Sequence, residues 1–126
     1  MDNNKHILVV DDEPDMVEWL TTFFNDHGYR TTFAYNGFEG FEKTLAEKPD
    51  LITLDITMDK ESGIKMYRKL HDSEETNKIP VIIITGVSPE LKGFIERRKQ
   101  VNPPAGYFEK PVEKEKLLET VRKLIG

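Results

Sequence analysis

The chain has 126 residues and no cysteine, and its 23 acidic and 18 basic residues give a formal net charge of −5. This length suits one domain, so we expect residues 1–126 to form a single domain without a separate output domain. The negative charge argues against direct nucleic-acid or membrane partners. The lack of cysteine excludes disulfides and thiolate metal sites, and it fits a cytoplasmic protein.

The first half of the chain predicts two strand–helix units. His6–Val10 is an aliphatic strand, and Pro14 after the acidic turn suits the start of a helix. Arg30–Tyr35 predicts a second strand, because Thr and aromatic residues alternate loosely there. The side chains expected on the buried helix faces are Met16, Val17, Leu20, Phe23 and Phe24 in the first helix, and Phe38, Phe41 and Leu45 in the second.

The second half continues the alternation with three more units. The predicted strands are Pro49–Leu54, Ile79–Thr85 and Ala105–Glu109. The strand at Ile79–Thr85 is so aliphatic that both of its faces should be covered. The helices between and after these strands are predicted to bury Ile64, Tyr67 and Leu70, then Leu91, Phe94 and Ile95, and finally Leu117, Leu118, Val121, Leu124 and Ile125.

Five strand–helix units with short connections predict an α/β fold. Parallel strands joined by right-handed crossovers place helices on both faces of the sheet. Five units in this length favour an open sheet over a barrel. We therefore expect a flavodoxin-like (βα)5 doubly wound parallel sheet with strand order 2-1-3-4-5.

Charged and hydroxyl side chains follow four of the five predicted strands. Asp11 and Asp12 follow the first strand, Asp55 follows the third, Thr85 ends the fourth and Lys110 follows the fifth. In an open parallel sheet these strand ends meet at one crevice. Crowded carboxylates repel one another unless a hard cation such as Mg²⁺ neutralises them. A hydroxyl and an ammonium opposite them would cradle a phosphoryl group, with one carboxylate as the nucleophile.

These motifs, taken in order along the whole chain, resemble the receiver domain of two-component response regulators. Met58 and Gly63 after Asp55, and Tyr107 before the lysine, extend the resemblance. The family implies that Asp55 accepts a phosphoryl group from a phosphohistidine on a sensor histidine kinase or a phosphotransfer protein. The residue roles that the resemblance implies are Mg²⁺ binding by Asp11, Asp12, Asp55 and the backbone carbonyl of Thr57, and phosphoryl binding by Thr85 and Lys110.

The resemblance also implies a conformational switch. Tyr107 would move inward when Thr85 shifts toward the phosphate. This would reshape the face formed by the fourth helix, fifth strand and fifth helix, which would contact a downstream protein or output domain. The same face is a candidate homodimer interface. The Lys110–Pro111 peptide bond is expected to be cis.

The chain departs from the family pattern at several positions. Asp59 stands where proline is common, Gly86 is smaller than the common alanine or serine, and the connection Val101–Pro104 is a few residues long. The family implies that Thr57 and Val87 help to set the lifetime of the phosphoryl group. We expect Val87 to restrict water more than a polar residue would.

Simpler interpretations exist for each residue alone. Asp11 and Asp12 could cap a helix, Thr85 could merely end a strand, and Lys110 could be a solvated charge. The Tyr107 hydroxyl could point into solvent. The residues without an expected role are His6, His27 and His71, which show no metal-ligand spacing.

Two other functional classes compete with the signalling module. A Mg²⁺-dependent aspartyl-phosphate phosphohydrolase or phosphotransferase usually has a second acid two residues after the nucleophile, where this chain has Thr57. A flavodoxin-like cofactor binder would need a phosphate loop after the first strand, where Asp11 to Glu13 would repel an anion. We therefore expect no enzyme activity beyond self-catalysed phosphotransfer and dephosphorylation. The sequence leaves open whether the chain is complete or part of a longer regulator or hybrid kinase.

Overall fold

The computed structural model describes residues 5–58, 62–86 and 104–126. Within these residues the strands are β1 His6–Val10, β2 Arg30–Ala34, β3 Leu51–Leu54, β4 Val81–Thr85 and β5 Gly106–Glu109. They form one sheet in the order β2-β1-β3-β4-β5, and every neighbouring pair is parallel. The predicted strand order is confirmed.

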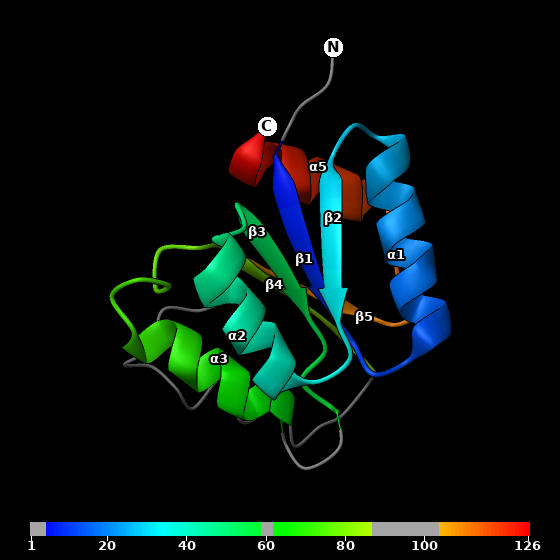
Figure 1. Cartoon of the computed structure of the whole chain (residues 1–126). Helices are drawn as coiled ribbons and strands as arrows, with labels where there is room; N and C mark the ends of the chain where they lie inside the picture. Colours follow the sequence, from blue (N-terminus) through cyan, green and yellow to red (C-terminus); the bar gives the residue numbers. More distant parts are fainter. Residues whose placement is uncertain (1–4, 59–61, 87–103) are drawn as a thin grey trace.

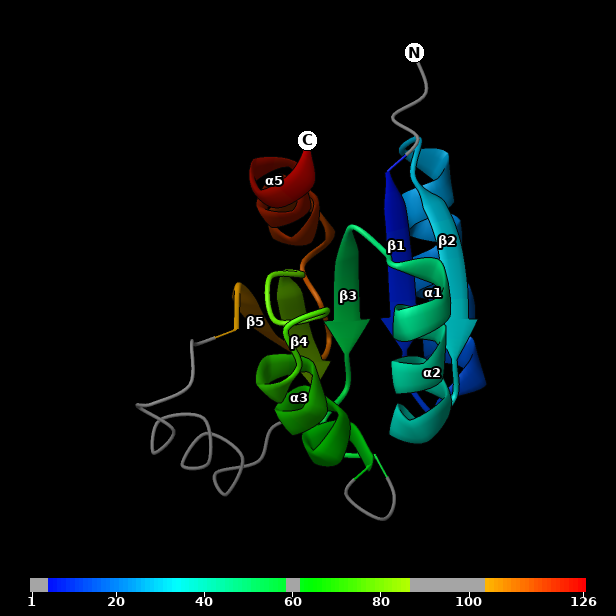
Figure 2. The same cartoon turned by 60° about the vertical axis from the view of Figure 1, so that its left-hand side comes forward.

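Helices cover both faces of the sheet (Figures 1 and 2). The described helices are α1 Pro14–Asp26, α2 Gly37–Glu47, α3 Ser62–Asp72 and α5 Lys114–Ile125. Helices α2 and α3 lie on one face, and α1 and α5 lie on the other. This is the doubly wound, flavodoxin-like fold that the sequence predicts. Some predictions concern residues outside the described ranges: those on Asp59, on Val87, on the helix carrying Leu91, Phe94 and Ile95, and on the connection before Pro104.

The core consists of two layers because successive strand residues point to opposite faces. Leu8 and Ile52 pack beneath α2 and α3, whereas Ile7, Leu51 and Ile82 pack beneath α1 and α5. Strands β1, β3 and β4 are buried along their entire length. The predicted cover on both faces of the fourth strand is therefore confirmed.

Helix α2 turns a different face to the core than the sequence predicts. Phe38 and Leu45 were expected to be buried, but they are 50% and 38% exposed. Gly37, Gly40 and Thr44 are buried instead. Each of these residues directly precedes an aromatic or leucine residue, so small residues face the core in place of Phe38 and Leu45, whereas Phe41 packs partly buried against the core as predicted.

A close approach between α2 and α3 explains why small residues of α2 face the core. A Cβ atom on Gly37 would lie 1.9 Å from the backbone oxygen of Ser62, and one on Gly40 would lie 2.8 Å from the Met66 sulfur. Only glycine at position 37 lets α2 rest against the start of α3, so close packing of backbones overrides the apolar stripe. Leu124, also expected in the core, lies exposed in the last turn of α5.

His6 has a structural role that the sequence analysis missed. Its ring is buried, and its Nε2 atom lies 2.7 Å from the hydroxyl oxygen of Thr32. That hydroxyl donates to Glu47 at 2.7 Å, so it accepts from His6, and Nε2 carries the proton. The His6 backbone N–H donates to Asp50 at 2.8 Å. This network ties β1 to β2 and to the end of α2.

None of the helices that the structure describes has the length and apolar character needed to span a membrane.

The His6 network predicts a pH dependence of folding. Burial, assisted by the charge of Arg30, lowers the pKa of His6 below its ordinary value of 6.5. The unfolded chain therefore takes up a proton below about pH 6.5 that the folded protein resists, and stability is lost as the pH falls. In His6→Gln the urea midpoint should fall less between pH 7.5 and 5.5 than in the wild type. Equal falls would contradict this, and His27→Gln at an exposed position is the control.

Candidate functional site

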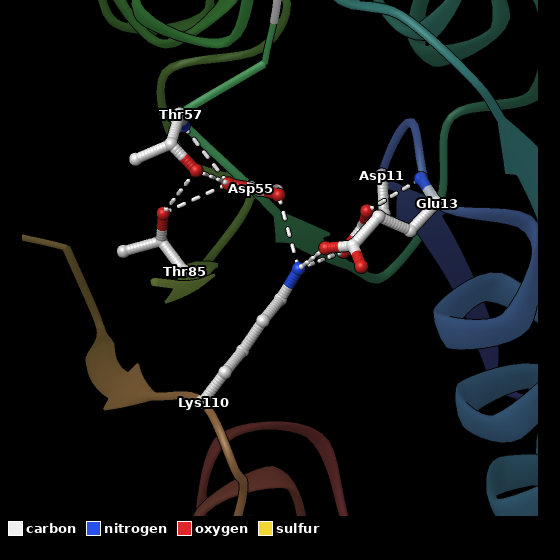
Figure 3. A network of polar contacts seen from close by, with 6 residues as sticks. All are labelled: Asp11, Glu13, Asp55, Thr57, Thr85 and Lys110. Atoms are coloured by element: carbon white, nitrogen blue, oxygen red, sulfur yellow. Dashed lines mark hydrogen bonds and ion pairs between the residues drawn. The ribbon is translucent and has the colours of Figure 1, made fainter. Parts of the chain in front are cut away.

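The four predicted groups converge at the carboxyl edge of the sheet (Figure 3). Asp11 follows β1, Asp55 follows β3, Thr85 ends β4 and Lys110 follows β5. Backbone hydrogen bonds continue the ladder into the loops: the Asp55 N–H donates to the Val10 oxygen at 3.0 Å, and the Lys110 N–H donates to the Thr85 oxygen at 2.9 Å. Parallel pairing therefore holds the functional side chains in register.

Asp55 is the centre of the site and is only 3% exposed. Its Oδ1 atom accepts from the Thr57 N–H at 2.8 Å, from the Thr57 hydroxyl at 2.7 Å and from the Thr85 hydroxyl at 2.8 Å. Its Oδ2 atom accepts from the Lys110 ammonium at 3.1 Å. The two oxygens thus differ: donors on two loops hold Oδ1, whereas Oδ2 faces the cationic and acidic groups (Figure 3).

A glycine brings the loop after Asp55 against the start of α3. A Cβ atom on Gly63 would lie 2.3 Å from the backbone oxygen of Asp55 and 2.6 Å from the Ile56 Cα. Because backbone cannot yield at that distance, a side chain at position 63 would displace the loop that follows Asp55. Gly63 therefore helps to position Asp55.

The Lys110 ammonium bridges carboxylates from separate elements. Its Nζ atom lies 2.6 Å from Glu13, 2.9 Å from Asp11 and 3.1 Å from Asp55. Burial lowers its pKa, but the hydrogen bonds to Glu13 and Asp11 and the charge of Asp55 outweigh burial and raise it. The ammonium therefore stays charged, and it offsets the repulsion among the carboxylates.

Asp11 is the most deeply buried acid of the cluster, at 1% exposed. Burial raises its pKa to about 6, against the hydrogen bonds from the Glu13 N–H and Lys110. Asp12, by contrast, is exposed. Asp11, Asp12, Glu13 and Asp55 each offer a carboxylate oxygen within 4.8 Å of the others. Hard oxygen donors at this spacing suit a magnesium-sized cation, so the donor set fits the expected ion.

Glu13 is a site residue that the sequence analysis named only as part of the acidic segment after the first strand. It does precede the first residue of α1, but its side chain makes no capping hydrogen bond within the described part of the chain. The carboxylate contacts Lys110 instead. The sequence does carry a signal for this role, because Glu13 is the third consecutive acidic residue after β1.

Tyr107 lies on β5, paired with Ile83 of β4. Its ring packs partly buried against the core beneath α2 and α3, and its hydroxyl oxygen is buried. The alternative in which this hydroxyl points into solvent is therefore wrong. The inward position of Tyr107 occurs together with the hydrogen bond between Thr85 and Asp55. Separately, the Lys110–Pro111 peptide bond is cis, as expected.

Comparisons with known proteins agree with this geometry. The family model described as the response regulator receiver domain matches residues 7–122. Protein PilH of Pseudomonas aeruginosa is 35% identical over 95% of this chain and 97% of its own length. The polar-differentiation response regulator DivK of Brucella anthropi is 30% identical over 97% of each chain.

A solved structure shares the fold. The signal receiver domain of a signal transduction histidine kinase from Syntrophus aciditrophicus superposes with a TM-score of 0.85 at 27% identity, over 96% of this chain and 89% of that one. The order of the strands, the residues at their carboxyl ends and the family match all agree. The chain belongs to the response regulator receiver domain family.

Proposed function

We propose that this chain is a phosphorylation-controlled signalling module in which Asp55 accepts a phosphoryl group from a sensor histidine kinase or a phosphotransfer protein. The observation that carries this proposal is the unequal environment of the two Asp55 oxygens. Three donors hold Oδ1, and Oδ2 faces Lys110 and the acidic cluster. Oδ2 attacks the phosphorus of a phosphohistidine, the P–N bond breaks, and the imidazole leaves with its electron pair.

The acidic cluster would hold the cation that this transfer needs. Asp11, Asp12 and Asp55, with the backbone carbonyl of Thr57, would bind Mg²⁺. Glu13 lies in the same cluster. When bound, the ion supplies positive charge that neutralises the phosphoryl oxygens.

Two residues of the chain would bind the transferred group directly. The Thr85 hydroxyl and the Lys110 ammonium already contact Asp55 from two sides, so they stand where phosphoryl oxygens would be placed. Both are donors, as an anionic group requires.

The output of the module would follow from the same contacts. The Thr85 hydroxyl would stop donating to Asp55 and would donate to a phosphoryl oxygen instead. The Tyr107 side chain on the neighbouring strand would change position with it. We propose that the face containing β5 and α5, together with the helix expected to carry Leu91, Phe94 and Ile95, then contacts a downstream protein, an output domain or a second copy. We also propose a cytoplasmic location, one domain over residues 1–126, and no enzyme activity beyond the phosphotransfer and dephosphorylation of Asp55 itself.

The hydrolase alternative is not favoured. The second acid that such enzymes usually carry would stand at Thr57, which donates both its N–H and its hydroxyl to Asp55. A donor held in this way cannot serve as a general acid or base for a separate substrate. The family match likewise supports the receiver domain.

The proposed role of Asp55 as phosphoryl acceptor predicts which variants can be labelled. Incubation with acetyl phosphate and Mg²⁺ should add one phosphoryl group to the wild type, seen by intact mass, and EDTA should prevent the addition. Asp55→Asn should gain none, because its amide cannot form an acyl phosphate. Asp26→Asn on the exposed side of α1 is the matched control and should be labelled normally. Labelling of Asp55→Asn to the wild-type extent would refute the assignment.

The proposed role of Asp11 as a Mg²⁺ ligand can be tested by removing its charge. Asp11→Asn should weaken Mg²⁺ binding, measured by calorimetry, by about tenfold or more because a charged ligand is lost. Without metal, Asp11→Asn should instead be favourable and should stabilise the folded protein. The pKa of Asp11 rises from 3.8 to about 6 on folding. The protonated carboxyl therefore stabilises the folded protein fully below about pH 4, and this stabilisation is lost as the pH rises through 6.

The neutral amide should therefore stabilise the metal-free protein at pH 7.5. The expected gain in the free energy of unfolding is on the order of 1–3 kcal/mol, measured with urea in EDTA. At pH 4 the gain should disappear, because the wild-type carboxyl is then protonated in the folded protein. A variant that is less stable than the wild type at pH 7.5 would show that the ion pair with Lys110 outweighs burial.

A further inference from the structure

One partner of Lys110, Glu13, has no assigned role in the phosphotransfer beyond its place in the acidic cluster. An ammonium carries three N–H donors and no acceptor. In the described residues these donors face three carboxylates: Asp11 at 2.9 Å, Asp55 at 3.1 Å and Glu13 at 2.6 Å. The shortest contact is the one with Glu13. The donors of Lys110 are therefore already engaged before any phosphoryl group arrives.

The three partners are not equally replaceable. The side chains of Asp11 and Asp55 are buried at the ends of β1 and β3, whereas the Glu13 side chain is 62% exposed at the start of α1. Breaking an exposed ion pair costs little, because water solvates the freed carboxylate. Leaving a buried carboxylate without its cation costs much more. Glu13 is thus the partner that Lys110 can give up.

A phosphoryl group on Asp55 would require such an exchange. Phosphorylation converts the Asp55 carboxylate into an acyl phosphate, which places new anionic oxygens beside Lys110. A charged donor must turn toward them, and all three Lys110 donors have carboxylate partners. While the phosphoryl donor approaches, Oδ2 is still charged and all three contacts compete with it; after the bond forms, the charge on the phosphoryl oxygens draws the ammonium away from Glu13, the partner that water can replace.

We propose that Glu13 competes with the phosphoryl group for Lys110: it holds the ammonium in the unphosphorylated protein, slows phosphorylation and is displaced when Asp55 is modified. This inference rests on the proposed function of Asp55. Glu13 is a positioning residue, since it acts through Lys110. Its removal should raise the rate of phosphorylation, whereas loss of Lys110 should lower it.

The kinetic test uses acetyl phosphate at saturating Mg²⁺, so that changes in metal affinity do not contribute. Glu13→Gln should be phosphorylated about two- to fivefold faster than the wild type, the range that corresponds to release of an exposed ion pair. Asp15→Asn makes the same change of charge two residues further along the exposed start of α1 and should react like the wild type. Equal rates for Glu13→Gln and Asp15→Asn would overturn the proposal.

A conservative variant separates competition from simple repulsion of the anionic phosphoryl donor. Glu13→Asp keeps the negative charge but shortens the side chain by one methylene, which weakens the contact with Lys110. Competition predicts that Glu13→Asp is also phosphorylated faster than the wild type. A wild-type rate for this variant would mean that the charge of Glu13 acts without Lys110, and it would overturn the proposal.

A second readout does not depend on phosphorylation. In the unphosphorylated protein, Glu13→Gln should shift the NMR signal of the Lys110 ε-methylene group, and Asp15→Asn should not. After phosphorylation the Lys110 signals of the wild type and Glu13→Gln should converge, because Glu13 has been displaced in both. Signals that stay equally different would refute displacement. Failure of the wild type to be labelled at all would instead refute the proposed function of Asp55, while the first NMR comparison would still report the contact.

Discussion

The site depends on one partly buried cation, the Lys110 ammonium, placed among carboxylates. Asp11 and Asp55 end neighbouring strands and lie almost wholly out of solvent, so their mutual repulsion would be poorly screened. The Lys110 ammonium, which follows the edge strand β5, contacts both. This single group joins three strand ends at the carboxyl edge of the sheet. The same contact keeps Lys110 charged, because the carboxylates raise its pKa against the effect of burial.

The contacts of Asp55 connect its chemistry to the rest of the fold. The groups that hold the carboxylate come from three segments: Thr57 lies in the loop after Asp55, Thr85 is the last residue of β4, and Lys110 follows β5. A phosphoryl group would replace these contacts with new ones of different reach and charge. In the proposed function, the same groups would therefore bind the phosphoryl group and change position when it is added. Tyr107 lies one strand away from Thr85, and its hydroxyl is buried.

Contacts remote from the chemistry support this arrangement. Gly63 allows the loop after Asp55 to touch the start of α3, and Gly37 allows α2 to rest against that same start. At the opposite edge of the sheet, His6 joins β1 to β2 through Thr32 and Glu47. The glycine contacts position the helices and the loop after Asp55, and the His6 contacts join β1 to β2. The parallel register determines which side chains meet at the carboxyl edge.

The sequence alone predicts the strands, their order, and the meeting of Asp11, Asp55, Thr85 and Lys110, because parallel strands must bring their carboxyl ends to one edge. Local patterns suffice for those features. The tertiary structure alone shows that α2 buries Gly37 in place of Phe38, that His6 is part of a network, and that Glu13 contacts Lys110. Each of these depends on atoms brought together from distant positions in the chain. Periodicity records which residues are apolar, but it does not record how closely two backbones approach or which carboxylate an ammonium can reach.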